Sequence, residues 1–471
     1  MTTLSSYSSM GGSLQPTIDH RAYPFEDSLE VPLTVKEIRY ENYSPISSLT
    51  GITSATTSRI EFNVPAVSDQ SMYNLKDSYV QFAIAVPTLA GNQGLTMMAS
   101  NALVPDVQVY FGSVLVSEPH SGGMYPWQAF VKDMLTRPTA AALSNYTGTD
   151  MKRNTIEELE FISTGTGYSS IRCADDGGGG AGSGAPNFIG ATKVYCTNST
   201  IYIRFRIHDG IFQTSKFFPA NMNLRIVLTL KLMNAFQENP GSTQVSGGAV
   251  TLSDAQFLLS RVFLSDDSLR AQNQALMRSP LKYILPYSKV ETKMVQSGQT
   301  FFNVNGLFQS QTKPDLVAIL FQNSTTDKTW PFFACGAAPA NGSTNMINAP
   351  AASSLYVRWN GRQYPAPTCS PLNSADIRSY DAYVSQCLED ESPFLPYLNW
   401  TRHFTVYYIS LRDDGEKMFG KAPMLETGSL EILCNFTAAT TTAATMYAIA
   451  LTHCKLEISD QAIVQKINYI N

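Results

Sequence analysis

The sequence is poor in charged residues, and this shortage excludes several classes of protein. Asp, Glu, Lys and Arg make up 15% of the 471 residues, against about 25% in an average soluble domain. Basic residues group only in pairs such as Lys152-Arg153, and the formal net charge is −5. A protein that neutralises many phosphates needs clustered Lys and Arg. We therefore expect no direct, sequence-specific binding of nucleic acid.

Long apolar runs are also missing. No run reaches the roughly 18 residues that a membrane span requires, so we expect no transmembrane segment. The stretch from Met1 to Gln15 is rich in Ser and Gly and lacks the basic start and apolar core of a signal peptide. Seven scattered cysteines without C-x-x-C spacing are typical of buried thiols in a reducing compartment, rather than of a disulfide framework: Cys173, Cys196, Cys335, Cys369, Cys387, Cys434 and Cys454.

The patterns that carry catalysis or metal binding are absent as well. No H-x-H or H-x-x-x-H pair exists among the five histidines, which are His20, His120, His208, His403 and His453. There is no G-x-S-x-G, and the glycine tract 177–184 lacks the Lys-Ser/Thr of a phosphate-binding loop. We expect no catalytic, cofactor or metal site.

Three kinds of polar group remain as alternatives to that expectation. His208-Asp209 at a strand end is either half of a site or, more simply, a turn with satisfied side chains. Acidic groups that could bind a divalent cation, but that solvated turns or helix N-termini explain better, occur at Asp175-Asp176, Asp266-Asp267 and Glu389-Asp390-Glu391.

Alternation with period two dominates the pattern from about residue 31 onward, and this is the mark of half-buried strands. The apolar sets at alternate positions are Ile60, Phe62 and Val64; Val80, Phe82, Ile84 and Val86; Ile201, Ile203, Phe205 and Ile207; and Leu224, Ile226, Leu228, Leu230 and Leu232. Gln256–Leu264 is a broader apolar run. The sequence therefore predicts an all-β protein.

Two hairpins and two helices complete the local prediction. Gly112-Ser113 predicts a type II′ turn, and Asn360-Gly361 is the strongest short hairpin signal that a sequence offers. Pro126 is followed by an apolar stripe at helical spacing, which predicts an amphipathic helix of about ten residues lying on a sheet. A second helix is predicted from about Asp266 to Met277, with Ser265 as its N-cap.

The chain length favours at least two domains. We predict an N-terminal arm at 1–30, a first β domain at 31–264 with a flexible Gly-rich loop at about 164–187, and a linker helix at 265–280. A second β domain follows at 281–471, with a long loop at about 328–354 and a C-terminal tail after 459.

Several motifs resemble those of double jelly-roll major capsid proteins of the Polinton-like virus, adintovirus and virophage type. Each motif is short, but they follow the family's order over about residues 60–465. They are Tyr73–Phe82, Val107–Ser117 leading into Tyr125–Leu135, His208–Gln213, Met222–Leu228, Leu276–Val290, Gly306–Gln309, Leu355–Pro365 and Gly428–Ile432. The sequence departs from the family in the two long loops.

The resemblance implies two tandem eight-stranded jelly rolls with a few short helices and long insertion loops. It also implies a non-catalytic major capsid protein forming pseudo-hexagonal homotrimers in the shell of an icosahedral dsDNA virus. Neighbouring capsomers, a penton protein and minor or cement proteins would be its partners. The protein would be made in the host cytoplasm, assembled there or in the nucleus, and located in the virion. The alternatives are a penton, minor capsid or receptor-binding spike component, or a β-sandwich lectin.

Overall fold

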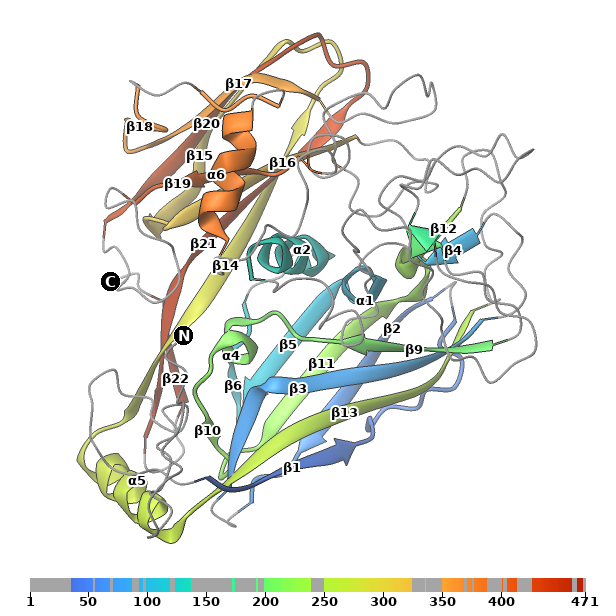
Figure 1. Cartoon of the computed structure of the whole chain (residues 1–471), viewed down its shortest axis with the longest axis vertical. Coiled ribbons are helices and arrows are strands. Elements are labelled where there is room, and N and C mark those ends of the chain that lie inside the picture. Colours follow the sequence, from blue (N-terminus) through green and yellow to red (C-terminus); the bar gives the residue numbers. More distant parts are fainter. Residues whose placement is uncertain are drawn as a thin grey trace, which may run out of the picture.

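The fold is described from a computed structural model of the whole chain (Figure 1). The residues described are 35–53, 56–67, 71–86, 93–95, 99–118, 123–136, 172–173, 192–193, 199–238, 250–323, 335, 350–367, 371–374, 377–387, 400, 405–412, 426–459 and 464–468. The predicted arm, most of both predicted long loops, and part of the predicted tail lie outside these residues.

Two antiparallel sheets form a first sandwich. One sheet has the order β1-β13-β3-β10, with β9 also on β3; the other has the order β2-β11-β5-β6. β9 pairs with the C-terminal part of β3, and β10 pairs with its N-terminal part. Both therefore lie along the same edge of β3, and α4 (Gly210–Gln213) lies between them in the chain. The strands are β1 (Val35–Tyr43), β2 (Thr57–Val64), β3 (Ser71–Val86), β5 (Asp106–Phe111), β6 (Val114–Leu115), β9 (Ser199–Phe205), β10 (Phe218–Pro219), β11 (Leu224–Lys231) and β13 (Thr251–Leu264).

A second sandwich repeats this order with new strands. Its sheets run β14-β21-β16-β19, with β22 also on β21, and β15-β20-β17-β18. The strands are β14 (Leu281–Val295), β15 (Phe301–Thr312), β16 (Leu316–Asn323), β17 (Ala352–Trp359), β18 (Arg362–Tyr364), β19 (Tyr407–Ser410), β20 (Thr427–Phe436), β21 (Ala444–Ile458) and β22 (Val464–Asn468). The equal strand order of both halves is that of two jelly rolls in tandem, so the predicted fold class is confirmed.

The remaining elements are short helices and two small ribbons. The helices are α1 (Ala99–Leu103), α2 (Tyr125–Thr136), η3 (Leu232–Ala235), α5 (Asp266–Arg278) and α6 (Ile377–Gln386), and the ribbons pair β4 (Gln93–Leu95) with β12 (Phe236–Glu238) and β7 (Arg172–Cys173) with β8 (Thr192–Lys193). No helix among the described residues is both long enough and apolar enough to cross a membrane.

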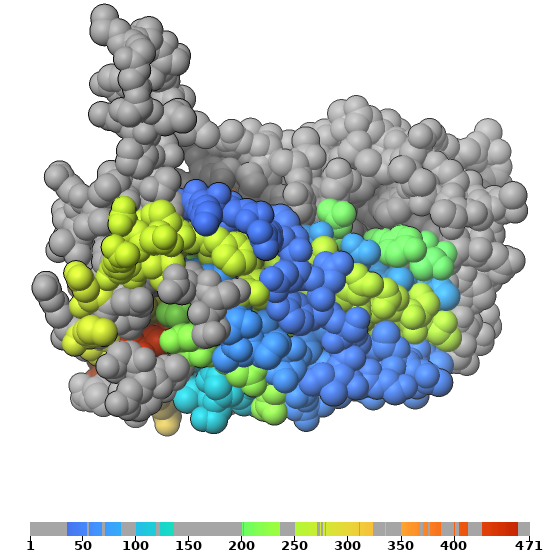
Figure 2. Space-filling view, turned by 90° about the horizontal axis from the view of Figure 1, so that it is seen from below, coloured from blue at the N-terminus to red at the C-terminus, as the bar shows by residue number. Residues whose placement is uncertain are grey.

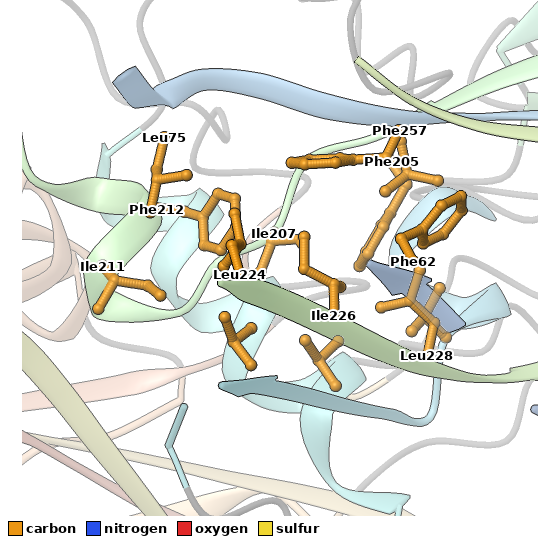
Figure 3. Packing of buried hydrophobic residues seen from close by; sticks show 14 of the residues in the cluster. Phe62, Leu75, Phe205, Ile207, Ile211, Phe212, Leu224, Ile226, Leu228 and Phe257 are labelled. Atoms are coloured by element: carbon orange, nitrogen blue, oxygen red, sulfur yellow. The ribbon is translucent and has the colours of Figure 1, made fainter. Parts of the chain in front are cut away.

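The apolar residues that alternate in the sequence of the first half form the core of the first sandwich. Phe62, Leu224, Ile226 and Leu228 project from one sheet toward residues of the other, such as Phe257 (Figure 3). Leu232 departs from the pattern, because the strand ends at Lys231 and Leu232 begins a short 3-10 helix.

The first core also draws on the second half of the chain. Leu281 and Tyr283 at the start of β14, and Leu456 and Ile458 at the end of β21, are buried in it. The ring of Tyr283 stacks on Phe218 with 4.6 Å between centroids, and its hydroxyl donates to the Phe217 carbonyl. The long ribbon of β14 and β21 therefore joins the two sandwiches through shared apolar packing.

Both predicted hairpins form as the turn chemistry requires. Gly112 has φ of 58° between β5 and β6, as a type II′ turn needs at its first central position. Asn360 and Gly361 have φ of 48° and 83° between β17 and β18, as a type I′ turn needs at both positions. The helix predicted from Asp266 is α5, and it connects the two sandwiches at one end of the molecule (Figure 1).

Two expectations need correction. The helix predicted from Pro126 is α2, but it is not amphipathic in its surroundings, because every residue from Tyr125 to Leu135 is buried. The segment after Ser459 is not only a tail: Val464–Asn468 form β22, which pairs with Cys454–Ile458 of β21. Pairing with the exposed edge of a long strand satisfies backbone groups that a free tail would leave to water.

Candidate functional site: a buried charged cluster between the sandwiches

Helix α2 lies between the two sandwiches and contributes to the packing of both (Figure 1). Tyr125 and Ala129 belong to the first core, while Trp127 and Phe130 pack against strands of the second sandwich. The ring of Trp127 lies 4.5 Å from that of Tyr447, measured between centroids. The helix thus fixes how one half of the chain sits on the other.

The polar side chains of α2 are buried together with charged groups from two connections. We call Glu118, Lys132, Asp133, His208 and Asp209 the junction cluster. Their exposed fractions lie between 1% and 5%. Charges buried this deeply are stable only when paired and hydrogen-bonded.

Lys132 is fully paired. Its Nζ lies 2.6 Å from both carboxylate oxygens of Glu118 and donates to the His208 carbonyl at 2.9 Å. These three acceptors match the three N–H donors of an ammonium group. Glu118 also accepts from the Gly210 backbone N–H at 3.2 Å and from the Ser288 hydroxyl on β14. One carboxylate therefore connects α2, α4 and the second sandwich.

Asp133 and Asp209 extend the network on either side of Lys132 and Glu118. Asp133 accepts from the Asn101 side-chain amide at 2.8 Å, and its other oxygen lies 3.5 Å from Nε2 of His208. Asp209 accepts from the backbone N–H of Glu118 at 3.4 Å. The cluster therefore holds the chain segments that follow β6 and β9 against one helix.

Tyr125 closes the cluster toward the first core. Its hydroxyl accepts from the His208 backbone N–H at 2.8 Å. Burial, reinforced by the Asp209 carboxylate, raises the pKa of Tyr125 well above its ordinary value. The phenol therefore stays neutral, which suits a position beside three carboxylates.

A close backbone contact adds to this junction. A Cβ atom built on Gly210 would lie 1.9 Å from the carbonyl oxygen of Pro286 on β14. Only glycine allows α4 to approach β14 at this distance. In the sequence, Gly210 appears only as part of the motif His208–Gln213, and nothing there indicates why a glycine is needed at this position.

A second buried charged group lies within the second sandwich. The side chain of Asp315 is 0% exposed, and its two oxygens contact Nη1 of Arg412 at 2.8 Å and Nδ1 of His453 at 3.1 Å. Three different segments meet here: the start of β16, the residues after β19, and β21. This group has the geometry of a structural ion pair that joins three segments of the second sandwich.

The sequence-predicted candidates are distributed as follows. His208 and Asp209 lie in the junction cluster, and His453 lies beside Asp315, so all three side chains are buried next to charged or polar groups of the core. Asp266 and Asp267 are exposed at the start of α5. Outside the described residues lie His20, His120, His403, Asp175-Asp176, Glu389-Asp390-Glu391 and the glycine tract 177–184.

Among the described residues, no three His, Cys, Asp or Glu side chains are placed to hold a metal ion. The described free cysteines, Cys335, Cys387, Cys434 and Cys454, are all buried. Burial raises the pKa of the Cys335 and Cys434 thiols, which makes these two poor nucleophiles.

The fold and its buried junction define the class of this chain: it is a double jelly roll with two sandwiches fixed to each other through α2 and the β14–β21 ribbon. No protein-family model and no curated protein matches the sequence.

Solved structures do match over almost the whole chain. The major capsid protein of mavirus aligns with a TM-score of 0.54 and 11% identity, covering 98% of this chain and 97% of that one. A chain of the PBCV-1 virus capsid aligns with a TM-score of 0.56 and 13% identity, covering 91% and 96%. A chain of the Sputnik virophage structure aligns with a TM-score of 0.56 and 11% identity, covering 98% and 95%. The resemblance predicted from the sequence motifs is confirmed at the level of the fold.

Proposed function

We propose that this chain is a major capsid protein that forms pseudo-hexagonal homotrimeric capsomers in the shell of an icosahedral dsDNA virus. The observation that carries the proposal is the end-to-end match of both jelly rolls to capsid proteins, with more than nine-tenths of each chain covered. A penton or spike with one jelly roll would match only half of this chain. The proposal therefore favours a shell subunit over the other virion components.

The geometry gives a physical reason for a trimer. Each chain holds two sandwiches of equal strand order in a fixed relation. Three such chains around one axis present six similar sides, which is the shape that tiles a hexagonal lattice. A rigid junction is required, because a hinge between the sandwiches would spoil the six-sided outline. The buried charges around α2 supply that rigidity.

The proposed role needs partners rather than substrates. Neighbouring capsomers, a penton protein, and minor or cement proteins would contact the trimer, and the protein would reside in the virion after synthesis in the host cytoplasm. We further propose that the arm at 1–30 ties capsomers together. Deletion of residues 1–25 is expected to lower particle yield and thermal stability, and unchanged values would contradict the role of the arm.

A mass measurement tests the trimer. The full chain, expressed alone and purified, is expected to elute in size-exclusion chromatography with light scattering at three times its mass of 51.7 kDa. Obligate interfaces bury on the order of 2,000–5,000 Å², so trimers are expected to persist at micromolar concentration. A soluble, folded monomer at that concentration would refute the proposal.

A further inference from the structure

His208 contacts helix α2 through both its backbone and its side chain. Its backbone N–H donates to the Tyr125 hydroxyl at 2.8 Å, and its carbonyl accepts from Nζ of Lys132 at 2.9 Å. Its imidazole Nε2 lies 3.5 Å from the Asp133 carboxylate. All three partners are on α2, so a change in the charge of this imidazole acts directly on the position of the helix.

α2 connects this histidine to the second sandwich. Met134 follows Asp133, and its carbonyl accepts from the Tyr383 hydroxyl of α6 at 3.1 Å. On the same helix, the ring of Trp127 packs on Tyr447 of β21. A shift of α2 would therefore uncover apolar side chains of the sheet β14-β21-β16-β19.

The junction cluster contains more carboxylates than permanent cations. Glu118, Asp133 and Asp209 are its three carboxylates, and Lys132 is its one ammonium group. With a neutral His208 the cluster would carry two uncompensated negative charges, and with a protonated His208 it would carry one. Uncompensated charge is costly in a buried site, so the cluster favours a proton on His208.

The other titratable groups around the cluster do not change this balance. Among the described residues they are Tyr125 of α2, Tyr287 of β14 and, next to Tyr287, Cys454 of β21. Burial raises the pKa of both tyrosines above its ordinary value, so neither carries a charge at neutral pH. α1 contributes uncharged side chains, such as Asn101.

Charged residues of β1 provide a contrast, because they lie at the surface of the molecule (Figure 2). Arg39 and Glu37 are 58% and 45% exposed there. Water screens such pairs, and their charges contribute little to stability. The junction cluster is buried, so a proton gained or lost there has a much larger effect.

We propose that His208 carries a positive charge in the folded chain and that the junction is a pH-sensitive device, which loosens when this proton is lost. The unfolded chain loses the same proton near pH 6.5, the ordinary pKa of histidine. Because the folded chain holds the proton to higher pH, its contribution to stability is fully present below pH 6.5 and is lost as the pH rises. These contacts lie within one chain, so the proposal does not depend on the proposed function.

The test compares the wild type with His208→Gln, which keeps a polar side chain and cannot take up a proton. Urea titrations of the full chain at one fixed protein concentration give the unfolding equilibrium constant at pH 6 and at pH 9. At pH 6 we expect this constant to be about ten-fold or more larger in His208→Gln than in the wild type, and we expect the ratio to fall by about ten-fold at pH 9. Ionisation of other groups, such as Cys454, occurs in both proteins and cancels in the ratio. A ratio that is equal at both pH values would overturn the proposal.

Asp133→Asn tests which carboxylate holds the proton on His208. The variant removes the charge beside Nε2 and keeps a side-chain oxygen that accepts from the Asn101 amide. In this background, His208→Gln should have nearly the same effect at both pH values, so the coupling between the two positions is present at pH 6 and lost at pH 9. A pH-dependent effect that persists without the Asp133 carboxylate would overturn the pairing.

Hydrogen exchange provides a readout at the helix itself and needs only the wild type. Protection factors, which take out the intrinsic pH dependence of exchange, report the opening of α2. We expect the protection of Tyr125–Thr136 to fall by about ten-fold or more between pH 6 and pH 9. Equal protection of α2 at both pH values would contradict the proposal even if the variants failed to fold.

Discussion

The junction cluster allows a quantitative test of how the two sandwiches are held together. Replacement of Lys132 by Met keeps the length of the side chain and removes its charge. Glu118, whose side chain is 2% exposed, would then carry a buried charge without its cation. Breaking a buried ion pair by removing one partner costs about 3–5 kcal/mol. A domain of 150–250 residues loses roughly 2–4 °C of melting temperature per kcal/mol, so we expect a drop of roughly 6–20 °C.

The matched control is Arg39→Met. Arg39 contacts Glu37 at 2.6 Å, but the two side chains are 58% and 45% exposed. Exposed ion pairs contribute about 0–1 kcal/mol, so this variant should melt within a few degrees of the wild type.

A double variant separates lost charge pairing from lost packing. Glu118→Gln removes the charge and keeps one acceptor oxygen for the Gly210 N–H, while its amide NH2 can donate to the Ser288 hydroxyl oxygen. Combined with Lys132→Met, it removes one positive and one negative charge, so the net charge of the junction cluster is that of the wild type, and most of the lost stability should return. Melting followed by circular dichroism at one fixed protein concentration is the assay. If the Lys132→Met variant had the same melting temperature as the Arg39→Met variant, the Lys132–Glu118 pair would not be what stabilises the junction.

Three other changes test separate parts of the structure. Gly210→Ala places a Cβ 1.9 Å from the Pro286 carbonyl oxygen, so it should lower the melting temperature clearly; an unchanged value would contradict the close approach. Burial raises the pKa of Tyr447 to about 12. An unfolded tyrosine ionises near pH 10, so the contribution of Tyr447 to the free energy of unfolding should be fully present below pH 10. It should then fall by up to about 3 kcal/mol as the pH rises to 12. A urea midpoint that stays constant across that range would contradict this expectation. Leu228→Ala in the core should cost about 2–5 kcal/mol, and Leu115→Ala, at a 44% exposed position, should cost far less in the same urea titration.

The strands and tight turns could be predicted from the sequence because their signals are local. Alternation in Ile60, Phe62 and Val64 reflects one buried face of β2, and Asn360-Gly361 is one of few dipeptides that adopt two successive positive φ angles at little cost. Such signals need no information about distant residues. The order of the motifs then placed the strands into two jelly rolls.

The environment of α2 could not be predicted in this way. Gln128, Lys132 and Asp133 are polar residues at the positions that a surface helix would expose to water. Their partners, Ser288, Glu118 and Asn101, come from segments 14 to 160 residues away. Helical periodicity cannot distinguish a polar side chain in water from one paired in the core. A lysine and a glutamate in the same buried junction can be recognised only after the topology is known.

The edge strand β22 was missed for a related reason. Its sequence, Val464-Gln-Lys-Ile-Asn, is short and lacks clean alternation. It becomes a strand because β21 is longer than β16 and leaves Cys454–Ile458 without a partner on that side. The length of a neighbouring strand, rather than the segment's own propensity, decides its structure.

Electron microscopy of the full chain expressed alone is the most direct test of the proposed capsomer. We expect pseudo-hexagonal particles in class averages, with six lobes from three chains and first and second sandwiches alternating around the ring, either isolated or as parts of sheets or shells. Monodisperse single-chain particles or elongated stalks would contradict it.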